Sequence, residues 1–135
     1  MDIDDSVNDN ELDWDDDLRV LNGHPYTGAS FLKYRDGQLE GEFCYKDGLP
    51  EGLQREWYPS GQIRSEFLAK NGQAFGEIKD WHWNGKIKSI SFVEFGIVLQ
   101  YDEWDEIGNL VCTRKIADSS GAMEYVRLMR ARSQK

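Results

Sequence analysis

Short stretches rich in Phe, Tyr, Trp, Ile and Val alternate with turn residues every 11 to 13 positions along most of the chain. Several turns are Asp-Gly or Asn-Gly pairs, which favour two-residue hairpin loops because a type I′ turn needs positive φ at both central residues. This spacing predicts short antiparallel strands in series. We expect strands at 27–35, 38–46, 50–59, 62–70, 74–83, 86–95, 97–104 and 109–116, with another near 18–22.

Glycine columns show that the predicted hairpins are copies of one unit. The columns step by 24 residues: Gly28, Gly52, Gly76; Gly37, Gly61, Gly85; Gly48, Gly72, Gly96. A fixed period carried from residue 28 to residue 96 is the signature of a repeat protein. We therefore predict an all-β fold, an open antiparallel meander of about three 24-residue β-hairpin repeats in a single sheet.

The turns also predict which side chains share a face. If Asp36-Gly37, Ser60-Gly61 and Asn84-Gly85 are two-residue loops, Trp57 pairs with Arg64 and Trp81 pairs with Lys88. Because side chains alternate along a strand, one face is expected to be packed. That face carries Tyr34, Leu39, Phe43, Tyr58, Ile63 and Phe67.

The opposite face combines tryptophans with bases, and its candidate partner-binding residues are Lys33, Arg55, Trp57, Arg64, Lys79, Trp81 and Lys88. Two interpretations stay open. The pairs could form a self-contained cation–π ladder, worth about 0.5–1 kcal/mol per exposed pair. Alternatively, the face binds a protein partner, since Trp and Arg are enriched at binding hot spots.

The charge of the chain is concentrated at its start. The net charge is -9, and residues 1–17 hold nine acids and no base, whereas the remaining residues are neutral in sum. A block of like charge repels itself, so we expect 1–17 to be a disordered leader, preceding a repeat domain over 18–116. Either the leader aids solubility or it docks on a basic partner through Asp13, Asp15, Asp16 and Asp17. Net acidity argues against nucleic acid or an anionic membrane as the ligand.

The C-terminal segment 117–135 has a different pattern from the repeats. Ser119 or Ser120 can cap a helix over 119–133 on which Ala122, Val126 and Met129 share a face. We expect this face to dock on one end of the sheet, because the end of a repeat array needs covering.

Catalytic chemistry finds little support in the sequence. Asp80 and His82 share a strand face, but the preceding repeat has Glu56 and Tyr58 in the same columns, which favours a structural role. No metal-ligand or cofactor motif is present, so we expect a non-enzyme without metal or cofactor. Cys44 and Cys112 form no disulfide framework and are expected to be free thiols, which favours a reducing cytoplasm. No apolar run is long enough to span a membrane.

Residues 49–72, LPEGLQREWYPSGQIRSEFLAKNG, carry the pattern G…WY..G.i…NG, and the units at 25–48 and 73–96 align with them in the same frame. This pattern resembles the bacterial variant of the MORN repeat, over about residues 18–111. The resemblance implies an elongated β-sheet with a binding role. It further implies an antitoxin or immunity protein that neutralises a cognate toxin, for which a basic, nuclease-like domain is the expected partner. The alternative is a MORN-type scaffold or adaptor for another cellular protein.

Overall fold

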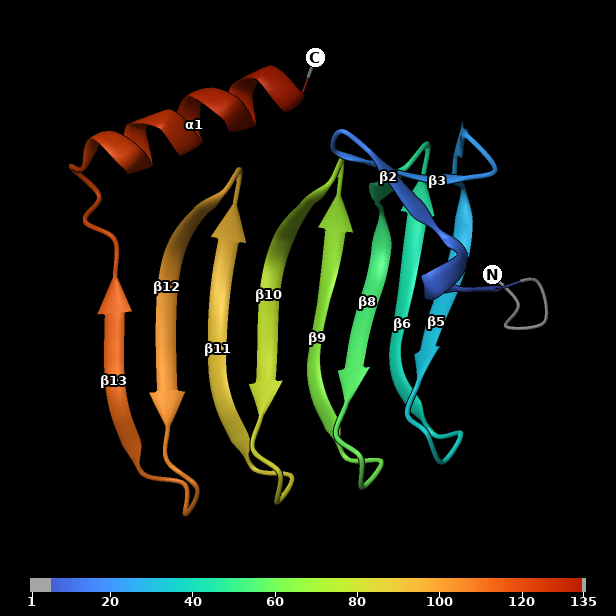
Figure 1. Ribbon diagram of the computed structural model, residues 1–135. Helices are drawn as coiled ribbons and strands as arrows, with labels where there is room; N and C mark the ends of the chain where they lie inside the picture. Colours follow the sequence, from blue (N-terminus) through green and yellow to red (C-terminus); the bar gives the residue numbers. More distant parts are fainter. Residues whose placement is uncertain (1–5, 135) are drawn as a thin grey trace.

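The computed structural model describes residues 6–134, which form one broad open sheet, a small three-stranded sheet, and a helix across the upper ends of the later strands of the broad sheet (Figure 1). In sheet order the strands are β1 (Val7–Asn8), β5 (Gly28–Lys33), β6 (Leu39–Lys46), β8 (Gly52–Trp57), β9 (Ile63–Lys70), β10 (Gln73–Trp81), β11 (Ile87–Glu94), β12 (Ile97–Trp104) and β13 (Leu110–Lys115). The short β7 (Leu49–Pro50) pairs with β6. All pairs are antiparallel except β1 with β5, and the predicted open meander is confirmed.

Two kinds of turn alternate between the ends of the sheet. At the upper end in Figure 1, Asp47-Gly48 and Asn71-Gly72 are two-residue loops with positive φ at both residues, as predicted, and Phe95-Gly96 has the same conformation. At the lower end, the N–H of Tyr34 donates to the carbonyl of Gln38, so the loop contains three residues. Equivalent bonds close the loops that follow Tyr58, His82 and Asp105. The predicted two-residue loops at this end are wrong.

The three-residue loops shift the register beside them by inserting a bulge. Trp57 lies opposite Ile63 and Trp81 lies opposite Ile87, so the predicted Trp57–Arg64 and Trp81–Lys88 pairs are wrong. Arg64 and Lys88 are the extra residues of their bulges. Beyond the bulge the predicted register returns.

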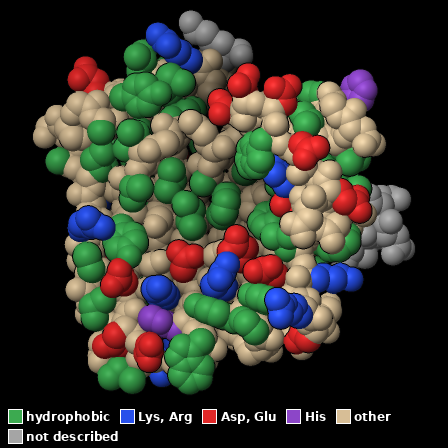
Figure 2. Space-filling model, in the orientation of Figure 1, with side chains coloured by type: hydrophobic (Ala, Val, Ile, Leu, Met, Phe, Trp, Pro, Cys, Tyr) green, Lys and Arg blue, Asp and Glu red, His purple; other side chains and the backbone are tan. Residues whose placement is uncertain are grey.

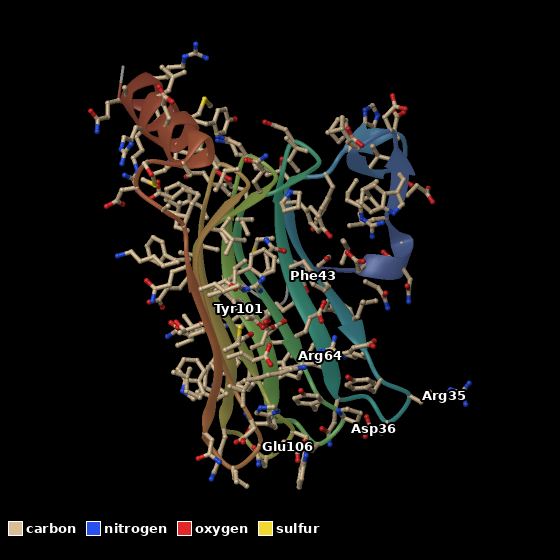
Figure 3. All side chains as sticks on the ribbon, turned by 90° about the vertical axis from the view of Figure 1, so that its left-hand side faces the viewer. Arg35, Asp36, Phe43, Arg64, Tyr101 and Glu106 are labelled. Carbon is tan, nitrogen blue, oxygen red and sulfur yellow. The ribbon has the colours of Figure 1, made fainter. Side chains whose placement is uncertain are left out.

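The sheet has two chemically different faces. The tyrosine face carries Phe43, Phe67, Ile78 and Tyr101, and the tryptophan face carries Leu53, Arg55, Trp57 and Trp81. Figure 3 places Phe43 and Tyr101 on the same side of the sheet. Alternation assigns the most buried residues of β5–β11 mainly to the tyrosine face: Ser30, Gln54, Ala69, Ser89 and Val93. The expectation that the face of Phe43 and Phe67 is the packed one agrees with the burial. The same expectation for Leu39 and Ile63 is wrong, because the bulges place these residues opposite Lys33 and Trp57, on the tryptophan face.

The acidic leader contradicts the expectation of disorder over residues 6–17; residues 1–5 lie outside the described part of the chain. Strand β1 adds to β5, a 3-10 turn η2 (Asp9–Glu11) follows, and β2 (Asp13–Asp15) pairs with β3 (Leu18–Leu21), which also pairs with β4 (His24–Pro25).

The contacts of one carboxylate explain why this part of the leader is ordered. Asp9 forms an ion pair of 2.8 Å with Arg19, whose side chain is 8% exposed. The other oxygen of Asp9 accepts hydrogen bonds from the hydroxyls of Ser30 and Tyr45. Three residues outside the leader therefore stabilise the negative charge of Asp9, for which the leader itself contains no basic residue.

The C-terminal helix α1 (Gly121–Ser133) confirms the predicted docking face. The hydroxyl of Ser120 caps it by accepting a hydrogen bond of 3.0 Å from the N–H of Met123. Val126 is completely buried, and a salt bridge of 2.6 Å joins Arg130 to Glu94 of β11. The helix crosses the upper ends of β10 to β13 (Figure 1).

Candidate protein-binding surface

A row of tryptophans crosses the lower part of the tryptophan face. Trp57, Trp81 and Trp104 occupy equivalent positions next to the three-residue loops, and Lys33 holds this position in the first hairpin. Each indole ring belongs to a half-buried residue at the end of its strand. The sequence columns place Trp57 and Trp81 here, and the register of β12 and β13 adds Trp104.

A second row, one step along the strands, consists of charged residues in cross-strand contact. The register aligns Glu42, Arg55, Glu66 and Lys79 on four neighbouring strands. Arg55 Nε lies 2.9 Å from Glu66 Oε2, and Lys79 Nζ lies 3.5 Å from Glu77 Oε2. The alternating signs make this row neutral in sum, with side chains that are all partly exposed. Such a row can orient a polar partner without attracting one sign of charge.

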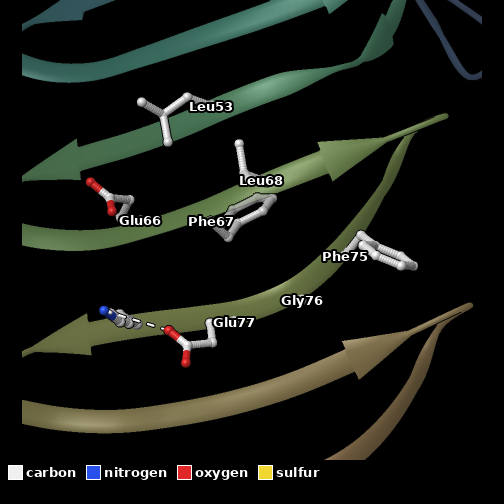
Figure 4. Close-up of a pocket in the computed structure, with 8 residues that line it drawn as sticks. Leu53, Glu66, Phe67, Leu68, Phe75, Gly76 and Glu77 are labelled. Carbon is white, nitrogen blue, oxygen red and sulfur yellow. Dashed lines mark ion pairs between the residues drawn. The ribbon is translucent and has the colours of Figure 1, made fainter.

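A third row is apolar and exposed. The exposed fractions are 56% for Leu68, 37% for Phe75 and 42% for Phe92. Leu68 lies beside Leu53 on one neighbouring strand and beside Phe75 on the other. Together with Glu66, Glu77 and Lys79 these three residues line an open groove of about 310 Å³ (Figure 4). Clustered exposed apolar side chains with a polar border are typical of protein interaction sites.

The tyrosine face carries most of its charge in a separate band. Figure 2 shows acidic and basic side chains alternating across the lower half of this face, below a hydrophobic area. Arg64, which Figure 3 places on the side of Phe43 and Tyr101, pairs with Glu56 and lies 5.9 Å from the ring centre of Tyr58. The hydrogen bond with Glu56 raises the pKa of Arg64, and the hydrogen bond with Glu103 raises the pKa of Tyr101. These shifts move both groups away from neutral pH, whereas a general acid or base works best near it.

The structure divides the predicted site residues into three groups. Lys33, Arg55, Trp57, Lys79 and Trp81 lie together on the tryptophan face, as predicted. Arg64 and Lys88 stand at bulges, and Arg64 is turned toward the tyrosine face. The exposed acids of the leader lie on the tyrosine side, Asp13 and Asp15 on β2 and Asp16 and Asp17 in the turn between β2 and β3.

The residue pattern alone did not reveal the exposed apolar row. Leu68 lies two residues from Glu66, and Phe92 lies two residues from Ile90. Because residues two apart share a face of a strand, the predicted register of β9 and β11 places Leu68 and Phe92 on the tryptophan face. Their chemical type favours a buried position, and only the structure shows that nothing in the described part of the chain covers them.

The two residues with potential acid–base chemistry have structural partners. Asp80 accepts a hydrogen bond of 3.1 Å from the hydroxyl of Ser89. His82 Nε2 lies 2.8 Å from the carbonyl oxygen of Trp104, which can only accept, so Nε2 is the donor. Among residues 6–134, no three His, Cys, Asp or Glu residues are grouped so that they could hold a metal ion. No helix in this range has the length and apolar character needed to cross a membrane.

Comparisons with known proteins identify the repeat. Residues 26–47 and 50–71 each match the family model for the MORN repeat variant. Searches among curated proteins and solved structures gave no match. The first matched range contains β5 and β6, and the second contains β8 and β9. Two consecutive hairpin units of this sheet are therefore similar to the MORN repeat variant.

Proposed function

We propose that this chain is a non-catalytic protein-binding module and that the tryptophan face is its binding surface. The observation that carries the proposal is the exposed row of Leu68, Phe75 and Phe92. The neutral charged row lies between these apolar side chains and the tryptophan row on the same face. Aromatic anchors, exposed apolar area and a polar border are the three components of a protein interface.

Within this class, we propose an immunity or antitoxin role, in which the chain binds a cognate toxin stoichiometrically and occludes its active site. The acidic leader supports this role, whereas the similarity to the MORN repeat variant supports the wider class of binding modules. Toxins that act on nucleic acids need basic sites, and an acidic inhibitor matches such a site in charge. A scaffold or adaptor that holds another cellular protein on the same face is the second candidate.

The ordered leader gives the acids a defined place. Asp13, Asp15, Asp16 and Asp17 are exposed on β2 and the following turn. The hydrogen bonds from Ser30 and Tyr45 to Asp9 hold this unit on the main sheet. Their position on the tyrosine side separates them from the tryptophan face. They therefore act by long-range steering of a basic partner, which salt screens over about 8 Å at physiological ionic strength.

Affinity capture from the native cell tests this role when the parent chain is compared with one variant of the tryptophan face and one variant of the tyrosine face. The Leu68→Asp/Phe92→Asp variant should lose the partner, whereas Ser91→Asp, on the tyrosine face, should retain it. Circular dichroism establishes that each form is folded. Co-expression then distinguishes the two candidates: the immunity role requires that the captured protein inhibits growth and that the parent chain relieves the inhibition. A captured protein without toxicity supports the scaffold role, and equal capture by all three forms contradicts the binding face.

A further inference from the structure

The last strand of the sheet offers a second interaction surface. Strand β13 pairs with β12, and the described residues provide no strand on its other side. The N–H of Ile116 donates to the carbonyl of Leu99 with a distance of 2.9 Å. Because these bonds alternate along an antiparallel strand, Cys112 and Arg114 also bond inward, and the N–H and C=O groups of Thr113 and Lys115 point outward. This edge is ready to pair with another strand.

The side chains along this edge fall into an apolar half and a basic half. Leu110 and Val111 are 56% and 54% exposed. Arg114 and Lys115 are also exposed, on opposite faces of the strand, and neither belongs to an ion pair within the described residues. Arg114 lies 5.0 Å from the ring centre of Tyr101, and Asp102 is engaged by Thr113 and Gln100. The positive charges at the edge are therefore available to an added strand.

The opposite edge of the same sheet shows how this chain covers an edge. There the acidic leader adds Val7 and Asn8 to β5 as a parallel strand, and Asp9 directly after it binds Arg19. An acidic, extended segment thus closes the first edge, and Arg19 of the neighbouring strand β3 neutralises its carboxylate. The last edge has the basic residues and lacks such a segment in the described part of the chain.

We propose that β13 binds an acidic, extended segment of a partner protein by antiparallel strand addition. Backbone hydrogen bonds to Thr113 and Lys115 supply the pairing, and two adjacent acids of the segment face Lys115 and Arg114. Apolar residues further along the segment lie next to Leu110 and to Val111, which is the extra residue of the last bulge. A second copy of this chain fits less well, because its own β13 brings the same two bases to the junction. This surface is separate from the tryptophan face and extends the proposed function to a second contact.

A fluorescent peptide tests the proposal in solution with the full-length chain. The probe is acetyl-Asp-Glu-Thr-Thr-Val-Val-amide, in which the acids face Lys115 and Arg114 when the strands are antiparallel. One control has Lys-Lys in place of Asp-Glu. A second control keeps the charges but carries N-methyl groups on Asp and the first Thr, whose N–H groups point at β13. We expect the probe to bind at least tenfold more tightly than either control.

Two further measurements link the binding to this edge. Arg114→Glu/Lys115→Glu should lose the acidic probe and gain the Lys-Lys control, and the probe should slow hydrogen exchange at the N–H groups of Thr113 and Lys115. Leu68→Asp/Phe92→Asp should bind the probe like the parent, so a failure of the tryptophan face is distinguishable from a failure of this edge. Absence of binding, or equal binding of the N-methylated peptide, would overturn strand addition. Sedimentation that shows a dimer blocked by Arg114→Glu/Lys115→Glu would assign the edge to a second copy instead.

Discussion

The hydroxyl of Tyr34 donates a hydrogen bond of 2.6 Å to the backbone carbonyl oxygen of Trp57, in the following hairpin. Tyr58 makes the same bond to Trp81, and His82 Nε2 repeats it to Trp104 at 2.8 Å. This ladder connects the lower ends of four consecutive hairpins. It explains why an aromatic donor recurs with the period of the repeat and why histidine can replace tyrosine in the third unit.

Removal of one hydroxyl from this ladder should destabilise the fold. Tyr58→Phe leaves the carbonyl of Trp81 without this donor, and we expect the free energy of unfolding to fall by about 1 kcal/mol. Urea denaturation measures the change. Tyr125→Phe is the matched control, because Tyr125 is exposed on α1. His82→Tyr should retain stability and His82→Phe should lose it; equal loss in both would contradict a donor role for His82.

The two-residue turns should tolerate no side chain at their second position. Gly72 has a φ of +84°, where an L-residue costs about 1–2 kcal/mol, so Gly72→Ala should lower the free energy of unfolding by that amount. Gly121, at the start of α1, has open space where a Cβ would stand. Gly121→Ala should therefore leave stability unchanged or raise it by a few tenths of a kcal/mol. Similar melting temperatures for the two variants would refute the turn assignment.

Much of the fold could be predicted from the sequence because the repeat signals are local. Dipeptides such as Asn71-Gly72 fix two-residue loops, and period-two alternation places Arg55 and Trp57 on one face. The lower loops could not be assigned in this way, because Asp-Gly also suits a three-residue loop that ends in a glycine with positive φ. The resulting bulge moved Arg64 out of the predicted row. One extra residue is thus enough to reverse the assignment of a binding residue.

The order of the leader depends on contacts between distant residues. Asp9 is one acid among nine in the first 17 residues, and nothing local distinguishes it. Its partners Arg19, Ser30 and Tyr45 come from positions 10, 21 and 36 residues further along the chain. Composition describes the average of a segment, whereas a single compensated carboxylate can anchor it to a folded sheet.

The Asp9 network gives a direct prediction. Asp9→Ala leaves the buried guanidinium of Arg19 without its carboxylate, and we expect a loss of about 3 kcal/mol in the free energy of unfolding. Hydrogen exchange over residues 7–15 should accelerate at the same time. Glu11→Gln, which changes an exposed acid of the same segment, should alter neither quantity. Unchanged exchange in Asp9→Ala would contradict the anchoring role.

The last lower loop should make stability depend on acid pH. Asp105 accepts hydrogen bonds from the N–H groups of Asn109 and Ile107, and the bond from Asn109 is the main reason that the pKa of Asp105 is lowered. A lowered pKa contributes stability above the ordinary carboxyl pKa of about 3.9, and this contribution is lost as pH falls through the folded-state pKa. The urea midpoint of the parent should therefore drop more between pH 5 and pH 2 than that of Asp105→Asn. Parallel pH profiles would argue against a carboxylate role at this turn.

The most direct test of the tryptophan face as a binding surface is site-specific photo-crosslinking in the native cell. Benzoylphenylalanine replaces Leu68 or Phe92 on the tryptophan face, or Ser91 on the tyrosine face as the neighbouring control. We expect positions 68 and 92 to give the same discrete protein adduct after irradiation and position 91 to give none. An adduct from position 91 alone, or equal adducts from all three positions, would contradict the assignment of binding to the tryptophan face.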